Sequence, residues 1–236
     1  MKKIICLILV IIAAVTGGVF VYLHMDKQVD VLNREAETIK KMDIKNAALI
    51  GLGAMGVFFA PRMEEHLGRE NFCVIAEGER KERLQTKGVT VNGVNYHFPI
   101  CTPEDGTPTD LIIMATKDLG LAQAIKDIEK FVGPDTQILC VMNGVNSEEQ
   151  VAAAYGWEHV LYSYMRMSIV MKNGKADFDP CWGKIYFGEK INETLSGRVE
   201  AVKEVLERCD IPYVIQKDML NGLWFKYMCN VGENLT

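Results

Sequence analysis

The stretch Leu49-Ile50-Gly51-Leu52-Gly53-Ala54-Met55-Gly56 decides the fold. It follows a short apolar run and opens an amphipathic one, and its glycines form a Gly-x-Gly-x-x-Gly motif. In such a motif the first glycine permits a tight turn, the second lets the backbone approach a phosphate, and the third allows close packing of helix on strand. A helix N-terminus also attracts anions. We therefore predict that residues 51–56 bind the pyrophosphate of a dinucleotide, the alternative being a turn of purely structural value.

Outward from this motif, short apolar runs alternate with helical patterns at about 54–67, 79–86 and 118–131. Apolar runs of this length, rich in β-formers, indicate strands that are buried on both faces of a parallel sheet. Strands that alternate with helices predict an α/β domain with a doubly wound, Rossmann-type, mostly parallel sheet, for which we expect the bounds 46–216. The predicted strands lie at 47–50, 72–76, 111–115 and 138–142.

Two Asn-Gly pairs predict β-hairpins. Asn92-Gly93 lies between runs at 89–91 and 95–100, and Asn173-Gly174 follows a run at 168–172. A helix at about 194–208 and a short strand at 212–215 complete the predicted domain, and a last helix runs from about residue 218 to the end of the sequence.

The N-terminal residues differ from this domain. Residues 4–23 carry no charge and follow Lys2 and Lys3. Such a helix, rising about 1.5 Å per residue, matches a hydrocarbon core about 30 Å thick, so we predict a membrane anchor at 1–24 and a charged spacer at 25–45. A later translation start, at Met25 or Met42, is the alternative. The positive-inside rule would export the domain behind such an anchor.

Composition narrows the class of protein. The 236 residues carry a net charge of −5 without basic blocks, which argues against nucleic acid as a partner. The seven cysteines contain no Cys-x-x-Cys pair, so they indicate neither a disulfide framework nor a metal site. A reducing compartment fits them best, and we expect the domain to be cytoplasmic unless residues 4–23 anchor it.

Charged residues after the second predicted strand bear on the cofactor. A dinucleotide motif predicts an acidic residue about 20 residues on, and Glu77 occupies that place. Its carboxylate would accept hydrogen bonds from ribose hydroxyls, which favours NAD(H). Arg80, Lys81 and Arg83 follow, and they either bind the 2′-phosphate of NADP(H) or form the solvated start of a helix. The residues alone leave this choice open.

Lys226, Asn230 and Asn234 are spaced four apart on the last predicted helix and so form one row. The row borders an apolar face centred on Leu223 and Trp224. It is either a wetted helix edge or a set of donors for a carboxylate-bearing substrate in a cleft. A lysine with an ordinary pKa near 10.4 is protonated at pH 7 and supplies charge and a proton to the alkoxide that forms when a ketone is reduced.

Two further polar groups follow predicted strands, at the edge where ligands of open α/β sheets collect. They are Thr116-Lys117-Asp118 and Asn143-Gly144-Val145. Taken separately, Lys117 could be an ordinary surface lysine and Asn143-Gly144 an ordinary turn.

Together these features resemble the ketopantoate reductase (2-dehydropantoate 2-reductase) family, over about residues 46–236. The glycine motif is shared by many dehydrogenases, whereas the Trp-x-Lys-x₃-Asn-x₃-Asn pattern of the last helix is more specific. The matching residues are the glycine motif, Lys117, Asn143-Gly144-Val145, and Leu223-Trp224-Phe225-Lys226 followed by Asn230 and Asn234.

The resemblance implies NADPH-dependent reduction of 2-dehydropantoate to pantoate, on the route to pantothenate and coenzyme A. It implies that Lys226 donates the proton, that Asn230 and Asn234 hold the substrate, that Lys117 contacts the cofactor, and that Asn143 contacts both. The chain departs from the family at Glu77, where an arginine for the 2′-phosphate is usual. It also lacks most of the C-terminal helical domain, so we expect 217–236 to be the first helix of a truncated all-helical domain.

Two rival functions stay open. The same fold could reduce another 2-oxo acid or an imine, or the chain could be a truncated dinucleotide-binding module, tethered to the membrane and without catalysis. We expect a small 2-oxo acid as the partner and no nucleic acid, and we leave open both a homodimer and membrane contact through residues 4–23.

Overall fold

The computed structural model describes residues 42–179 and 181–234. The predicted anchor and most of the predicted spacer lie outside the described residues. No helix within those two ranges combines the length and the apolar character that crossing a bilayer requires. The folded unit begins at Met42, four residues before the predicted domain boundary. Ile44 is buried in its core, and Arg208 donates a hydrogen bond to the Ile44 carbonyl.

Eight strands form the main sheet in the order β12-β11-β8-β7-β6-β1-β2-β5. Every neighbouring pair is parallel except β8 and β11, which confirms the predicted doubly wound sheet. The chain runs outward from β1 to β2 on one side and returns to β6 on the other, so the switch in strand order lies at β1. The strands are β1 (Ala47–Ile50), β2 (Phe72–Ile75), β5 (Ile100–Cys101), β6 (Thr109–Met114), β7 (Val132–Cys140), β8 (Val160–Arg166), β11 (Lys184–Gly188) and β12 (Tyr213–Val214).

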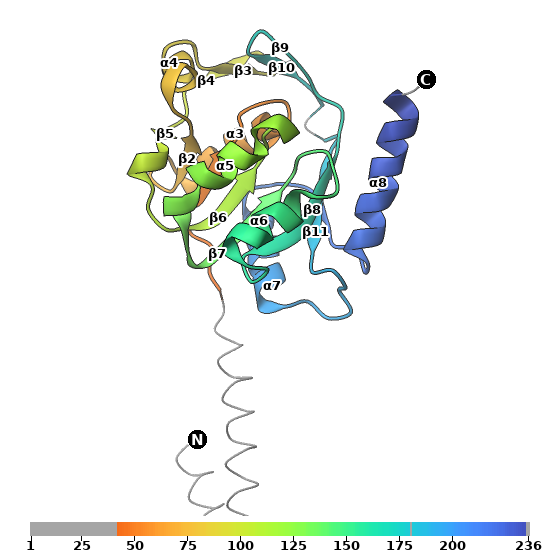
Figure 1. The fold of residues 1–236 in the computed structure, drawn as a ribbon. Coiled ribbons are helices and arrows are strands. Elements are labelled where there is room, and N and C mark those ends of the chain that lie inside the picture. Colours follow the sequence, from red (N-terminus) through yellow and green to blue (C-terminus); the bar gives the residue numbers. More distant parts are fainter. Residues whose placement is uncertain (1–41, 180, 235–236) are drawn as a thin grey trace, which may run out of the picture. The chain divides into compact units, whose positions relative to one another are not determined.

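Helices cover both faces of this sheet (Figure 1). Side chains alternate along β1, so that Leu49 points to one core and Ile50 to the other. The first core is covered by α3 (Gly56–Leu67) and α7 (Gly197–Arg208), and the second by α5 (Leu121–Asp127) and α6 (Ser147–Tyr155). Because both faces are buried there, β1, β2, β6 and the second half of β7 are the apolar runs from which the sheet was predicted.

Some predicted elements are wrong in extent. The helix expected at 118–131 is divided into η2 (Asp118–Gly120), α5 and η3 (Glu129–Phe131), and a glycine at position 120 disfavours a continuous helix. The run at 95–100 divides at Pro99, which has no N–H to donate to a strand partner. Its second part, β5, joins the edge of the main sheet. Helix α6 and strands β8 and β11 were not predicted.

A second, smaller sheet is built from the two predicted hairpins, which are confirmed. Its order is β4-β3-β10-β9, and β10 pairs in parallel with β3. Both Asn-Gly turns carry the asparagine at positive φ, 48° at Asn92 and 51° at Asn173. Figure 1 shows this sheet near α4 (Gly78–Lys87). A short 3₁₀ helix, η1 (Pro103–Asp105), follows β5. The strands are β3 (Val89–Val91), β4 (Val94–Tyr96), β9 (Val170–Lys172) and β10 (Lys175–Asp177).

The last helix, α8 (Met219–Asn234), packs on β8 and β11 through a third apolar cluster that contains Tyr164, Met219 and Leu223. A Cβ on Gly222 would lie 2.0 Å from Gln216 Oε1 and 2.7 Å from the Tyr164 hydroxyl. Glycine at position 222 therefore sets how closely the helix approaches the sheet.

The predicted orientation of α8 is wrong. Trp224 is 49% exposed, and Tyr227 and Val231 are exposed as well. The face toward the sheet carries Met219, Leu223, Lys226 and Asn230, at helical spacing. The polar row thus continues the buried face instead of bordering it.

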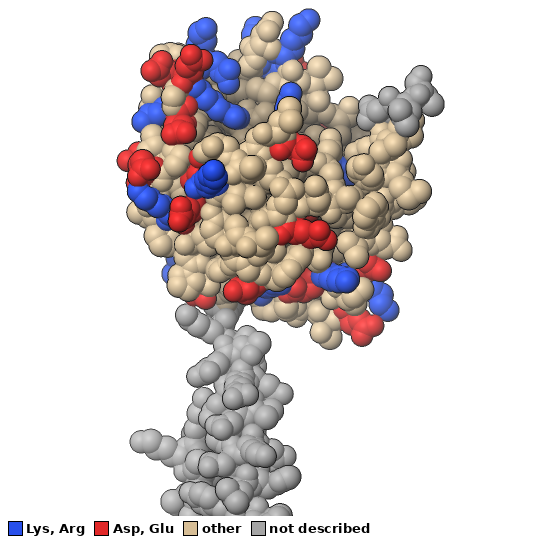
Figure 2. Space-filling model, viewed as in Figure 1, with Lys and Arg blue, Asp and Glu red and all other residues tan. Residues whose placement is uncertain are grey.

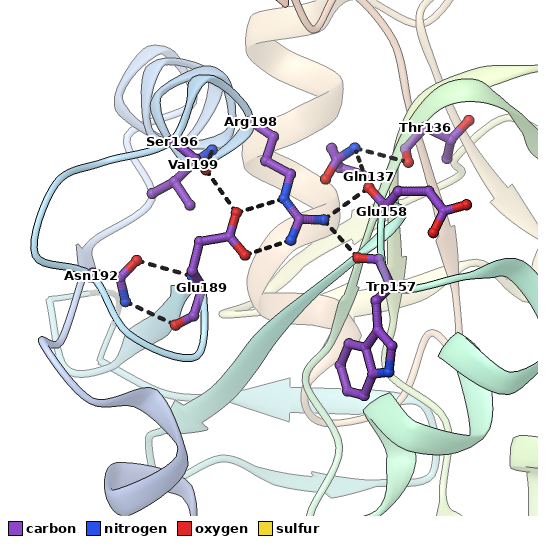
Figure 3. A network of polar contacts seen from close by, with 9 residues as sticks. All are labelled: Thr136, Gln137, Trp157, Glu158, Glu189, Asn192, Ser196, Arg198 and Val199. Atoms are coloured by element: carbon purple, nitrogen blue, oxygen red, sulfur yellow. Dashed lines mark hydrogen bonds and ion pairs between the residues drawn. The ribbon is translucent and has the colours of Figure 1, made fainter. Parts of the chain in front are cut away.

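A polar network ties α7 to loops at the amino ends of the parallel strands (Figure 3). The Arg198 guanidinium donates to both carboxylate oxygens of Glu189, at 2.6 and 2.5 Å, and to the carbonyls of Trp157 and Glu158, each at 2.8 Å. Burial alone would raise the pKa of Glu189, but the hydrogen bonds from Arg198 and Ser196 outweigh it and lower that pKa. This edge lies opposite the glycine turn, so the network has a structural role.

Candidate functional site

In the glycine turn after β1, each of the three glycines is placed in a different environment. Gly51 has a φ of +100°, and a Cβ there would lie 2.5 Å from the Ala115 carbonyl carbon at the end of β6. A Cβ on Gly56 would lie 2.1 Å from the Gly51 carbonyl oxygen. A Cβ on Gly53 would meet nothing within 4 Å. Folding therefore requires the first and third glycines, whereas the second leaves the backbone accessible, as a pyrophosphate site needs.

Beside this turn lies a cavity of about 1000 Å³, over the carboxyl ends of β1, β2 and β6. Gly53, Glu77, Arg80 and Lys117 all line it, so the structure brings these predicted residues together. The β9–β10 hairpin forms another part of the wall, which was not predicted. The charged side chains of the wall are five cations and two carboxylates. They are Arg80, Arg83, Lys87, Lys117 and Lys175, and Glu77 and Asp127.

The cavity is therefore cationic in a chain whose net charge is −5. Figure 2 shows Lys and Arg side chains over the region where Figure 1 places α4 and the small sheet, with Asp and Glu side chains among them near α4. Burial lowers the pKa of the Arg80 guanidinium, and the neighbouring Arg83 lowers it further. An arginine beside a second arginine is stabilised by an anion, so this wall suits phosphate groups.

Two polar residues of the wall, Glu77 and Thr116, are further reasons why the cavity fits a nucleotide. Glu77 is exposed at the N-cap of α4, and its side chain makes no cap hydrogen bond. The Thr116 hydroxyl, just after β6, is buried without a hydrogen-bond partner among the described residues. Leaving a buried hydroxyl unpaired costs about 1–3 kcal/mol, and a ligand in the cavity that Thr116 lines would offset that cost. The residues present thus fit a dinucleotide.

A second cluster joins α8 to the end of β7. The Lys226 ammonium donates a hydrogen bond to Asn143 Oδ1 at 3.0 Å, and its Nζ lies 5.8 Å from the centre of the Tyr164 ring. Burial lowers the pKa of Lys226 to about 8, with a further lowering by Arg166 and an opposing effect of Glu148. The expectation of an ordinary lysine pKa is therefore wrong. At pH 7 the amine is still mostly protonated, but it releases its proton more readily.

The two predicted asparagines differ in what the structure shows of them. Asn230 lies one turn beyond Lys226 on the same face of α8 and is half-buried. The Asn234 side chain lies outside the described residues. Their roles in holding a substrate stay predictions.

Glu148, in the first turn of α6, lies near the second cluster but was not among the residues predicted from the sequence. It is 1% exposed and accepts hydrogen bonds from the Ser147 hydroxyl, at 2.9 Å, and from the Ser163 N–H of β8, at 3.2 Å. Burial raises its pKa to about 7 against the opposing hydrogen bonds. Acidic residues are common in the first turn of a helix, so the sequence does not mark Glu148 as special. It is a buried titratable group that interacts with Lys226.

The family model described as ketopantoate reductase PanE/ApbA matches residues 47–192. The chain belongs to the ketopantoate reductase PanE/ApbA family. The match contains the glycine turn, Glu77, Arg80, Lys117, Asn143 and Glu148, but it ends before α8. The resemblance from which this family was predicted is confirmed.

The individual relatives of this chain have low sequence identity to it. The uncharacterised oxidoreductase YkpB of Bacillus subtilis is 24% identical over 185 residues, which are 76% of this chain and 60% of that protein. The chain thus spans about 60% of the length of this relative.

Solved structures share its fold. The 2-dehydropantoate 2-reductase of Porphyromonas gingivalis gives a TM-score of 0.65 at 21% identity, covering 79% of this chain and 68% of the other. The ternary structure of D-mandelate dehydrogenase with NADH and anilino(oxo)acetate gives 0.64 at 19% identity, covering 77% and 60%.

Proposed function

We propose that this chain reduces a 2-oxo acid with NAD(P)H, with 2-dehydropantoate as the first candidate and pantoate as the product. The observation that carries this proposal is the hydrogen bond between Lys226 and Asn143, at the sheet edge that also holds the glycine turn. The name of the family and of the Porphyromonas structure supports the choice of substrate. Pantoate formation would place the chain on the route to pantothenate and coenzyme A.

The chemistry needs two groups at one carbonyl. When bound, NAD(P)H would supply a hydride to the carbonyl carbon. The oxygen of that carbonyl would then need a proton and a nearby positive charge. The Lys226 ammonium supplies both, donates its proton to the oxygen, and regains one from water. With a pKa of about 8, Lys226 is a stronger acid than an ordinary lysine and is still charged at pH 7. Asn143 holds the ammonium through its amide oxygen.

For the cofactor we propose NADP(H). The five cations of the cavity wall exceed its two carboxylates, and Arg80 and Arg83 lie on α4, directly after the place where the adenosine ribose binds in this fold. Glu77 is the argument for NAD(H), since a carboxylate there would repel a 2′-phosphate. The NADH named with D-mandelate dehydrogenase, a protein of the same fold, also supports this alternative.

A second candidate is a 2-oxo acid with a flat apolar side chain. Tyr164 and Tyr186 stack beside Lys226 with ring centres 4.7 Å apart and planes 5° apart. The anilino(oxo)acetate named with D-mandelate dehydrogenase is of this kind. A panel that compares phenyl-substituted with branched aliphatic 2-oxo acids separates the two candidates.

The test measures oxidation of NADPH and of NADH by the 236-residue chain with 2-dehydropantoate. Lys226→Met should lower kcat roughly 100-fold or more without changing cofactor affinity, because general acid catalysis contributes about 10²–10⁴-fold. Lys217→Met, just before α8, is the matched control and should have no effect. Unchanged turnover in Lys226→Met would refute the assigned role. Cofactor binding by the wild type without turnover of any 2-oxo acid would favour the non-catalytic module.

A further inference from the structure

Two cations face each other beside Lys226 without an evident structural reason. Arg166 ends β8 and Lys184 begins β11, and they are direct partners in the antiparallel register. Directly opposed residues of an antiparallel pair project from the same face of the sheet, which is here the face that carries Tyr164 and Tyr186 under α8. Like charges in this arrangement destabilise a sheet. Both side chains are exposed.

No carboxylate neutralises this pair among the described side chains, which cover residues 42–179 and 181–232. The Arg166 guanidinium instead lies 5.8 Å from the ring centres of both Tyr186 and Phe225. These rings hold the guanidinium but leave its N–H donors without an anionic acceptor. These donors are therefore available to an anionic ligand.

The position of Arg166 relative to Lys226 suits one kind of ligand. Lys226 is placed against Tyr164, Arg166 is placed against Tyr186, and the two tyrosines stack on each other. Phe225, which contacts Arg166, is the neighbour of Lys226 in sequence. A 2-oxo acid carries its carboxylate on the carbon next to the ketone, so it needs two adjacent cationic groups with different tasks.

We propose that Arg166, with Lys184 opposite, binds the carboxylate of the 2-oxo acid and thereby directs its oxo group to Lys226. This inference rests on the proposed function and adds a specificity-determining residue to it. A guanidinium binds a carboxylate through two parallel hydrogen bonds, which fixes the orientation as well as the position of the substrate. Arg166 lies inside the range matched by the family model, at the strand end that follows Asn143 along the sheet edge.

The kinetic test compares a 2-oxo acid with its neutral methyl ester, which keeps the ketone and loses the charge. Arg166→Ala should raise KM for the acid roughly 10- to 100-fold, since hydrogen bonds to charged groups contribute about 1.5–3 kcal/mol. KM for the ester should change less than about threefold, so the preference for the acid disappears. Arg166→Lys keeps the positive charge but loses the two parallel N–H donors of the guanidinium, so it should give an intermediate preference for the acid over the ester. Lys190→Ala, beyond the other end of β11, is the control.

A binding measurement keeps the inference independent of turnover. Calorimetry should show oxamate, a carboxylate analogue, binding to the wild-type chain with NADPH, and binding should weaken roughly tenfold or more in Arg166→Ala but not in Lys190→Ala. Thermal unfolding of both variants checks their folding. Oxamate binding that depends on Arg166, in a chain that turns over no 2-oxo acid, would support Arg166 as the carboxylate-binding residue and refute the proposed reductase activity. If folded Arg166→Ala keeps the preference for the acid or the affinity for oxamate, Arg166 does not bind the carboxylate. This conclusion holds even if the chain turns over 2-oxo acids.

Discussion

The Lys226 ammonium and the Asn143 amide oxygen are 3.0 Å apart although 83 residues of sequence separate them. Because the oxygen of this amide accepts from Lys226, its NH₂ group is the part left to donate to a ligand. The contact also couples α8 to the end of β7, so a shift of the helix along its axis would break it.

The pH dependence of turnover should follow Lys226. Reduction uses the protonated amine, so kcat for NADPH oxidation should be constant below a pKa of about 8 and should fall as the pH rises through that value. Oxidation of the hydroxy acid uses the neutral amine, and its rate should rise through the same range. Rates measured in both directions between pH 6 and pH 10 check this prediction. Profiles with the same slope in both directions would contradict it.

Gly53 and Gly56 should separate cofactor binding from folding. Gly53→Ala should leave the free energy of unfolding within about 0.5 kcal/mol of wild type and weaken dinucleotide binding about tenfold or more. Gly56→Ala should lower the free energy of unfolding by roughly 2 kcal/mol or more, because its Cβ would collide with the Gly51 carbonyl. Urea unfolding and fluorescence titration with NADPH measure the two effects. Equal losses of stability in both variants would argue against this division.

Glu148 should make the stability of the fold depend on pH. Its pKa rises from 4.5 to about 7 on burial, so between these values the native state binds more protons than the unfolded state. The free energy of unfolding should therefore fall by about 3 kcal/mol from pH 4.5 to pH 7, at about 1.4 kcal/mol per pKa unit, and should then level off. Glu148→Gln should remove most of this fall. Glu149→Gln, at an exposed neighbour, should leave it in place, and denaturant unfolding at pH 5 and pH 7.5 compares them.

Arg198 should contribute to stability and not to catalysis. Arg198→Ala would leave the carboxylate of Glu189 and the carbonyls of Trp157 and Glu158 without their donor. We expect a loss of about 2 kcal/mol, less than for a fully buried pair because both side chains are about a quarter exposed. Lys203→Ala, which breaks a more exposed pair on the same helix, should cost about 0.5 kcal/mol or less. Equal unfolding midpoints for the two variants would contradict this assignment.

Glu77 should set part of the cofactor preference. Glu77→Arg replaces a carboxylate of the cavity wall by a cation, so the ratio of NADPH to NADH affinity should rise, by roughly tenfold. Glu79→Arg makes the same change of charge in the same first turn of α4 but outside the cavity wall. It should shift the ratio little. A shift of equal size in both variants would mean that general charge, and not contact with the ribose, is responsible.

Much of the fold could be predicted because β1, β2, β6 and the second half of β7 are buried on both faces. The glycine turn, the first two helices and both Asn-Gly hairpins depend on local rules that are visible in a few residues. Strands β8 and β11 escaped prediction because one of their faces carries Tyr164, Arg166, Lys184 and Tyr186, which interrupts any apolar run. That same face contains Arg166, for which we propose binding of the substrate carboxylate, so the polar residues that hid the strands are the ones to which we assign a function.

The candidate site was only half predictable for a similar reason. Spacing placed Lys226 and Asn230 on one row, but which way the row faces depends on contacts of α8 that lie far apart in sequence. Gly222 permits the helix to approach Tyr164, and this approach turns Lys226 inward while Trp224 faces outward. Glu148 resembles an ordinary helix-start residue, and only its burial under β8 distinguishes it.

The pairing of β10 with β3 has a consequence for how the chain folds. Thr90 donates a backbone hydrogen bond to the Gly174 carbonyl, so one wall of the nucleotide cavity closes only when segments about eighty residues apart meet. Contacts of such high sequence separation form late, after the loop-closure entropy has been overcome. In a refolding time course, helical signal should therefore recover first, and the capacity to capture a nucleotide should return last.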